Sequence, residues 1–159
     1  MRMSFYKKFN RILEIAMIII TSILVIDVLW QVFSRYILNA PSSFTDELAG
    51  YLLIWVSLLG AAYVVGTQEH LAIDILLQRS TPSRQKILRI IIQSVIIAFA
   101  TSVLILGGSW LVYTRFYLGV KSAAIQLPLG YVYSILPISG LIILYYSIYH
   151  LMNVIKNRS

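Results

Sequence analysis

The sequence predicts an all-α integral membrane protein with four transmembrane helices. The composition is the first reason, because 59% of the 159 residues are hydrophobic, only 12% are charged, and the mean hydropathy is +0.83. Long uncharged stretches are the second reason: no charged residue occurs within 48–68, 90–114 or 122–155. A helix over the first of these would extend roughly 31 Å at about 1.5 Å per residue, which is one hydrocarbon thickness. This combination is typical of membrane proteins rather than of soluble domains.

The four spans are predicted at residues 12–38, 46–68, 87–116 and 129–154. The first span follows basic residues and could be taken for a signal peptide. It is too long and contains Asp27, so we expect it to be retained. Nothing left over is large enough for a soluble domain, and residues 1–159 are therefore expected to form a single membrane domain. After the second span, residues 71–79 alternate apolar and polar side chains, which predicts a short segment lying in the membrane interface.

The basic residues predict the orientation of the spans. Ten of the thirteen lie before the first span, around the second loop or at the C-terminus, whereas Arg35, Arg115 and Lys121 belong to the other side. Because basic residues accumulate in cytoplasmic loops, both termini are expected to be cytoplasmic. The excess of basic residues is thus explained by the cytoplasmic surface of the membrane and gives no support to nucleic-acid binding.

Charged residues stand at both ends of the second predicted span. Asp46 and Glu47 lie in its first turn, where negative charge is favourable to the helix dipole. Glu69 and His70 lie at its cytoplasmic exit. Arg35 ends the first span and has the opposite charge to Glu47, so we expect these two side chains to form an ion pair that orders the external hairpin.

Asp27 is the only acid predicted to lie well inside a span. Gln31 and Arg35 follow it at helical spacings of four and eight residues, so the three form a polar strip along one side of the helix. Carboxylates within a membrane serve as ion or proton sites or as polar contacts between helices. We interpret the strip as a protein-facing surface, with ion or proton handling as the alternative.

Small residues and a proline mark the third and fourth spans. Gly107, Gly108 and Ser109 form a small-residue surface that favours close helix packing in lipid. Pro137 and Gly140 are expected to bend the fourth helix.

The sequence contains no pattern typical of a catalytic site, a metal site or a phosphate loop, so neither an enzyme nor a cofactor is predicted. Two alternatives use single residues. A proton-coupled antiporter of the small multidrug type would use Asp27, although the basic bias argues against the dual insertion it requires. A haem-bearing membrane anchor would use His70 and His150, since four-helix membrane bundles can hold b-type haem, but both histidines are expected near the cytoplasmic surface.

Four stretches give the chain a family resemblance: VFSRYILNAPSSFTDELAGYL, IWVSLLGAAYVV, EHLAID and SAAIQLPLGYVYSILPISG. Together they resemble the small membrane subunit of tripartite ATP-independent periplasmic (TRAP) transporters over almost the full chain. The sequence departs from that family at Phe44, where a tryptophan is frequent, at Asp46, where a second glutamate is frequent, and at Gly50, where a basic residue is frequent.

The resemblance implies a non-enzymatic accessory subunit of the bacterial inner membrane. In that family the small subunit binds a larger multi-span permease, and a periplasmic binding protein delivers an organic acid, such as a sialic acid or a C4-dicarboxylate, for uptake driven by a sodium gradient. The resemblance implies no cofactor and no metal on this subunit; its partners are the large permease subunit, the binding protein and membrane lipid. We expect structural or partner contacts from eight polar residues: Asp27, Gln31, Arg35, Asp46, Glu47, Glu69, His70 and Asp74.

Overall fold

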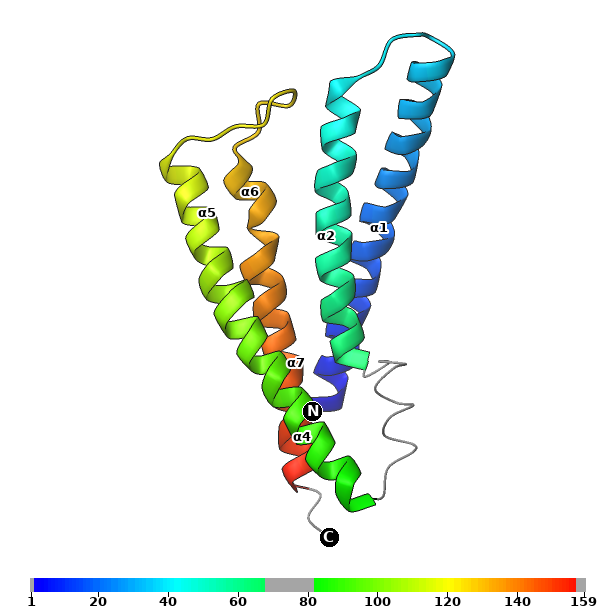
Figure 1. Ribbon diagram of the computed structural model, residues 1–159. Helices are drawn as coiled ribbons and strands as arrows, with labels where there is room; N and C mark the ends of the chain where they lie inside the picture. The colour runs from blue at the N-terminus through cyan, green and yellow to red at the C-terminus, as the bar shows by residue number, and fades with distance from the viewer. Residues whose placement is uncertain (1, 68–81, 157–159) are drawn as a thin grey trace. The chain divides into compact units, whose positions relative to one another are not determined.

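The structure is a computed structural model that describes residues 2–67 and 82–156. The expectations for Glu69, His70 and Asp74, and for the interfacial segment at residues 71–79, lie outside these ranges. Within them the chain is helical, apart from its loops and an isolated antiparallel bridge between Lys121 and Pro128. The elements are α1 (Arg2–Tyr36), α2 (Ser43–Thr67), α4 (Pro82–Phe99), the π-helical η1 (Ala100–Gly107), α5 (Gly108–Tyr117), α6 (Leu129–Tyr133) and α7 (Ile135–Lys156) (Figure 1).

Four stretches of these helices are long and apolar enough to cross a membrane: Tyr6–Tyr36, Ser43–Thr67, Arg84–Tyr117 and Leu129–Lys156. The predicted class, an all-α membrane protein with four spans, is therefore confirmed. Two spans, Ser43–Thr67 and Arg84–Tyr117, lie between residues 37–42 and residues 118–128. Since the chain crosses the membrane twice between them, these two loops must lie on the same side of the membrane. We call this side the loop side.

The first helix begins earlier than its apolar stretch. It starts at Arg2 rather than at residue 12 and ends at Tyr36 rather than at residue 38. The preceding residues include no proline or glycine, so nothing in the sequence stops the helix where its hydrophobic face stops. Hydropathy locates the part of a helix that crosses the membrane, whereas capping and helix-breaking residues decide where the helix itself ends.

The third span starts at a proline and is not uniform. Pro82 is the first residue of α4, the helical position where a missing backbone N–H costs nothing. The span predicted at 87–116 contains the π-helical segment η1, Ala100–Gly107, between α4 and α5. Hydropathy records length and composition and does not distinguish α-helical from π-helical hydrogen bonding, so this segment was not predicted from the sequence.

The fourth span is interrupted between α6 and α7 at Ser134. Pro137 accounts for the position of this break. Proline has no N–H to donate to the carbonyl four residues earlier, which belongs to Tyr133, and its ring crowds that carbonyl. The interruption thus lies in the turn that precedes Pro137, the residue that was expected to bend this helix.

The chain forms two compact units. Unit 1 consists of Met1–Gly60 and Trp110–Ile135, and unit 2 consists of Ala61–Ser109 and Leu136–Ser159. Unit 1 thus contains α1, most of α2, most of α5, and α6. Unit 2 contains the end of α2, α4, η1 and most of α7.

Glycines allow close helix packing inside unit 2. Gly108 lies against Leu136 and Pro137 at the start of α7, and Gly140 of α7 lies against Leu104 and Ile105 of η1. The small-residue surface expected at residues 107–109 is used in this way at Gly108, which is buried. Its neighbours Gly107 and Ser109 are exposed.

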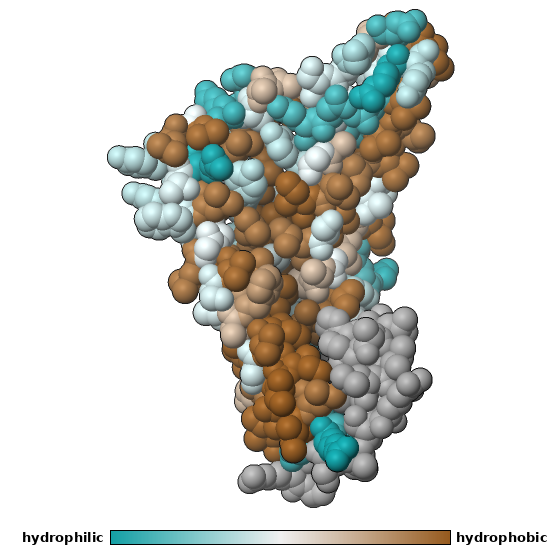
Figure 2. Space-filling model, in the orientation of Figure 1, coloured by the Kyte–Doolittle hydropathy of each residue, from teal (hydrophilic) through white to brown (hydrophobic). Residues whose placement is uncertain are grey.

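Most of the helical surface is apolar. On α1, Ile18, Ile26 and Leu29 are each more than 60% exposed. Figure 2 shows hydrophobic side chains covering most of the visible helical surface, with hydrophilic ones gathered near the loop between α1 and α2. In water such a surface would be costly, but against lipid tails it is the surface that a spanning helix needs.

Candidate functional site

A polar cluster on the loop side of unit 1 joins α1 to α2. Arg35 Nη2 lies 3.3 Å from Asp46 Oδ1, and the side-chain amide of Gln31 donates a hydrogen bond to the same oxygen. The ion pair expected between Arg35 and Glu47 is therefore replaced by one with Asp46. Consecutive residues of an α-helix point about 100° apart, so Asp46 and Glu47 cannot both face α1.

We expect the Arg35–Asp46 ion pair to contribute little to stability. The two side chains are 49% and 48% exposed, and exposed pairs are worth between about 0 and 1 kcal/mol. Arg35→Gln should therefore lower the free energy of unfolding in detergent by less than about 1 kcal/mol. Arg11→Gln is the matched control, because Arg11 forms another exposed pair, with Glu14 at 3.3 Å. A markedly larger loss for Arg35→Gln than for the control would contradict this expectation.

Glu47 instead binds the backbone of the loop between α5 and α6. Its Oε1 accepts hydrogen bonds from the N–H groups of Ala123 and Ala124, at 2.9 and 3.0 Å, and its Oε2 accepts one from Ile125 at 3.1 Å. In Figure 1 this loop extends toward the first turns of α2. One carboxylate thus gathers three consecutive backbone donors, in an arrangement that is strengthened by its negative charge.

The loop that carries these donors is closed on itself. Ser122 N–H donates to Leu127 O at 2.9 Å, Leu127 N–H donates to Ser122 Oγ at 3.2 Å, and Leu129 N–H donates to Val120 O at 3.0 Å. Gly119 and Gln126 take the left-handed conformation, with φ of 60° and 59°. Glycine adopts this conformation readily and glutamine rarely, so the turn at Gln126 depends on the contacts around it.

A second bond ties α2 to α6. Trp55 Nε1 donates a hydrogen bond of 3.0 Å to the carbonyl of Val132. On the other side of α6, the ring of Tyr131 meets Phe116 of α5 edge-on with 5.0 Å between centroids, and Gly130 leaves room for the same phenylalanine. Sequence reasoning missed the Glu47 and Trp55 contacts because they join residues 76 to 78 positions apart.

Asp27 lies within unit 1 and is only 8% exposed. Its Oδ2 has no hydrogen-bond partner among the residues that the structure describes. Gln31, one turn further along α1, reaches Asp46 of α2. Asp27 and Gln31 thus face protein, while Arg35 at the end of the strip is half exposed. No group of three or more His, Cys, Asp or Glu side chains that could hold a metal ion occurs within residues 2–67 and 82–156.

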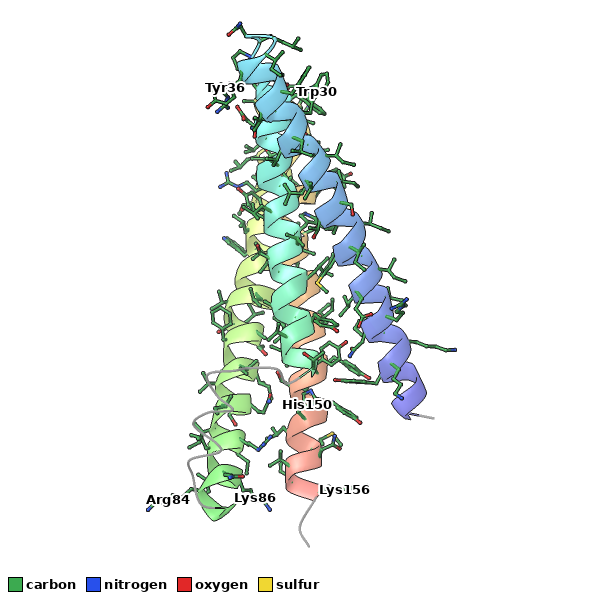
Figure 3. The ribbon with its side chains drawn as sticks, turned by 90° about the vertical axis from the view of Figure 1, so that its right-hand side faces the viewer. Trp30, Tyr36, Arg84, Lys86, His150 and Lys156 are labelled. Atoms are coloured by element: carbon green, nitrogen blue, oxygen red, sulfur yellow. The ribbon has the colours of Figure 1, made fainter. Side chains whose placement is uncertain are left out.

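His150 connects α7 to the end of α2 in unit 2. Its Nε2 lies 2.9 Å from the carbonyl oxygen of Gly66, and the contact is buried. A carbonyl only accepts hydrogen bonds, so Nε2 must carry the hydrogen. Figure 3 labels His150 on α7. Nε2 of His150 is therefore engaged in holding two helices together.

Replacing His150 with leucine should destabilise unit 2 modestly. The change removes the donor to Gly66 O, and hydrogen bonds between helices in membranes contribute about 1 kcal/mol or somewhat less. We expect a loss of that size in the free energy of unfolding, measured by thermal or denaturant unfolding in detergent. Met152→Leu, at a position that is 55% exposed on the same helix, should change nothing measurable. Equal stability of the two variants would show that the hydrogen bond is unimportant.

The fold and these contacts define a multi-pass helical membrane protein whose polar side chains join its own helices and loops. Residues 24–157 match the family described as "Tripartite ATP-independent periplasmic transporters, DctQ component". The chain therefore belongs to the DctQ family, the small permease subunits of TRAP transporters. It is a transporter component and a multi-pass protein of the inner membrane.

Two relatives support this assignment. A protein of Haemophilus influenzae named for the small permease protein of a TRAP transporter is 32% identical over 136 residues, which cover 84% of this chain and 81% of the relative. The sialic acid TRAP transporter small permease protein SiaQ of Vibrio cholerae is 23% identical over 154 residues, which cover 94% of this chain and 85% of the relative. The family expected from the four sequence stretches is thus confirmed.

Proposed function

We propose that this chain is the accessory subunit that supports a large permease subunit and helps to dock a soluble binding protein during sodium-driven uptake of an organic acid. The observation that carries this proposal is the use of Glu47. Its carboxylate is fully engaged by three backbone N–H groups and so builds a fixed loop on the loop side of the membrane. A carboxylate that is bonded to backbone N–H groups has a structural role in shaping the proposed docking surface, and we do not assign it a role in ion transport.

The proposed docking surface for the binding protein is formed by the two loops of the loop side. Lys121 and Gln126 are exposed on one loop, and Arg35 and Asp46 lie beside the other. The substrate proposed is an organic acid. Sialic acid is a candidate because the Vibrio cholerae relative is named for it.

The proposed orientation places both termini in the cytoplasm. In unit 2, Arg84 and Lys86 at the start of α4 lie at the same end as Lys156 of α7 (Figure 3), and basic residues favour the cytoplasmic side. The chain has no cysteine, so single cysteines can be introduced without background. A cysteine at Ser42 should react with an impermeant external thiol reagent, while cysteines at Ser4 and Ser159 should be shielded. The reverse pattern would overturn the orientation.

Reconstitution tests the function itself. The chain is purified with and without a large permease subunit of its family and is placed in liposomes with a binding protein, substrate and a sodium gradient. We expect stable co-purification of the two membrane subunits and uptake only from the complete set. Substrate accumulation in liposomes that contain this chain alone would overturn the accessory role.

A second candidate function, proton or ion handling by Asp27, is favoured by its burial and by an Oδ2 atom that has no hydrogen-bond partner within residues 2–67 and 82–156. Asp27→Asn distinguishes the two in the complete reconstituted set. Asparagine keeps the size and hydrogen-bonding capacity of the side chain but cannot ionise, so an accessory subunit should retain most of its uptake. Complete loss of uptake with normal assembly would favour the ion-handling role.

A further inference from the structure

An apolar cavity of about 240 Å³ lies in unit 1 between α2 and the segment formed by the α5–α6 loop and α6. From the geometry of this cavity we propose that it is a binding site for one acyl chain of a membrane phospholipid. This inference is independent of the orientation of the protein and of its transport role. The lining residues are Phe44, Leu48, Tyr51, Leu52, Trp55, Ile125, Leu127, Tyr131 and Val132.

The cavity is held open by bonds at both of its ends. Glu47, which precedes the lining residue Leu48, binds the loop at Ala123–Ile125, and Trp55 at the other end of the lining donates to Val132 O. These two contacts fix the separation between α2 and the opposite wall. Collapse of the cavity would require breaking them, so the space is built into the unit.

The chemistry of the lining selects an apolar occupant. All nine lining residues are aliphatic or aromatic, and the indole N–H of Trp55 is already used by Val132 O. Water in a cavity needs several polar partners, whereas an apolar cavity of about 150 Å³ in another protein stays dry and binds benzene. The cavity described here is larger and can take a continuous run of methylene groups.

The extent of the lining along α2 matches one lipid leaflet. On α2 the lining runs from Phe44 to Trp55, which spans roughly 17 Å along a helix, close to half of the about 30 Å hydrocarbon core. Phe44 and Tyr131 are 51% and 58% exposed, so the cavity has an open side. An acyl chain of the loop-side leaflet would therefore run beside α2 over the whole length of the lining.

A basic residue belongs to the loop that forms one wall of the cavity. Lys121 is exposed and is paired by backbone with Pro128, which follows the lining residue Leu127. Lysines near a membrane surface attract lipid phosphate groups. The apolar cavity and this cation together fit a phospholipid, whose acyl chain would fill the cavity while its phosphate would pair with the lysine.

Native mass spectrometry of the full-length protein after extensive detergent washing tests the proposal. Wild type should retain one phospholipid per chain. Leu52→Trp fills the cavity and should weaken the affinity for the lipid roughly tenfold, a change that corresponds to about 1.4 kcal/mol, so its lipid-bound fraction should be lower than that of wild type. Leu53→Trp is the matched control, since Leu53 is 56% exposed and lies outside the lining, and it should bind as wild type does. Lys121→Gln should weaken retention of phosphatidylglycerol more than that of phosphatidylethanolamine.

A second measurement needs no change in the cavity. The protein has three tryptophans, so Trp30→Phe with Trp110→Phe leaves Trp55 as the only one. In bilayers with increasing amounts of brominated phospholipid, quenching of Trp55 should saturate at a low fraction if a site is occupied, and should rise in proportion to the fraction if contact is only with bulk lipid. Proportional quenching, absence of retained lipid on wild type, or equal retention by Leu52→Trp and Leu53→Trp would each overturn the proposal. A further outcome would also overturn it: wild type retains no lipid, and the Leu52→Trp variant no longer binds the large subunit. The occupant of the cavity would then be a protein side chain.

Discussion

Replacing Glu47 with alanine should release the loop between α5 and α6 and should cause the largest functional loss of any single polar substitution in unit 1. The N–H groups of Ala123, Ala124 and Ile125 would lose their common acceptor. A hydrogen bond to a charged acceptor contributes more free energy than an ordinary hydrogen bond, so its loss costs more. We expect amide hydrogen exchange at these three residues to accelerate by on the order of tenfold or more. Uptake by the reconstituted transporter should fall with it, because the loop forms part of the proposed docking surface.

A graded series separates the geometry of Glu47 from its charge. Glu47→Gln keeps the length of the side chain but offers one acceptor oxygen instead of two, so its effect should lie between those of wild type and alanine. Glu47→Asp keeps the charge but is shorter by one methylene group and should fail to reach all three donors. Glu14→Gln is the control for loss of a carboxylate elsewhere and should leave exchange in the loop unchanged. Unchanged exchange at residues 123–125 in Glu47→Ala would refute the anchoring role.

The membrane fold could be predicted because lipid enforces a simple rule. Every backbone polar group inside the hydrocarbon must be satisfied within its own segment, so a long uncharged stretch such as residues 48–67 becomes a helix. Breaks in the helices depend on finer features. The interruption before Pro137 follows from proline chemistry, whereas the glycines nearest to η1, Gly107 and Gly108, lie at its end, and no proline or glycine lies where it begins.

The pairing of the polar residues in the candidate site could not be predicted from the sequence. The opposite charges in the sequence predicted that Arg35 would pair with an acid at the start of the second span. They did not indicate whether this acid is Asp46 or Glu47. The choice depends on the rotation of α2 about its axis, and Glu47 is directed to the other side because backbone N–H groups 76 to 78 residues away are available there. Backbone donors have no signature in a sequence. The short run Ser122–Ala123–Ala124 is the only hint, since small side chains allow a carboxylate to approach the chain.

Gly108→Ala should destabilise unit 2 strongly, whereas Gly107→Ala, one residue earlier, should not. A Cβ added at Gly108 would lie 2.8 Å from Leu136 Cβ and 3.1 Å from Pro137 Cδ. These atoms are attached directly to the backbone or belong to a proline ring, so they cannot turn aside as the end of a flexible side chain can. Overpacking of this kind costs typically about 1–3 kcal/mol. At Gly107 the nearest atom is Ser102 O at 3.6 Å, an ordinary contact, and alanine is favoured over glycine in helices by up to about 1 kcal/mol.

The reciprocal contact at Gly140 provides a further check on this expectation. A Cβ there would lie 2.8 Å from Leu104 Cβ and 2.9 Å from Ile105 Cγ1, so Gly140→Ala opposes the same approach of η1 to α7. Once one alanine has pushed the two helices apart, the second has less contact left to disrupt. The double variant Gly108→Ala with Gly140→Ala should therefore lose less free energy of unfolding than the sum of the single variants, as expected for coupled neighbours. Thermal unfolding in detergent of the four variants measures both effects. Equal stability of Gly107→Ala and Gly108→Ala would show that the close approach of Gly108 to the start of α7 does not hold unit 2 together.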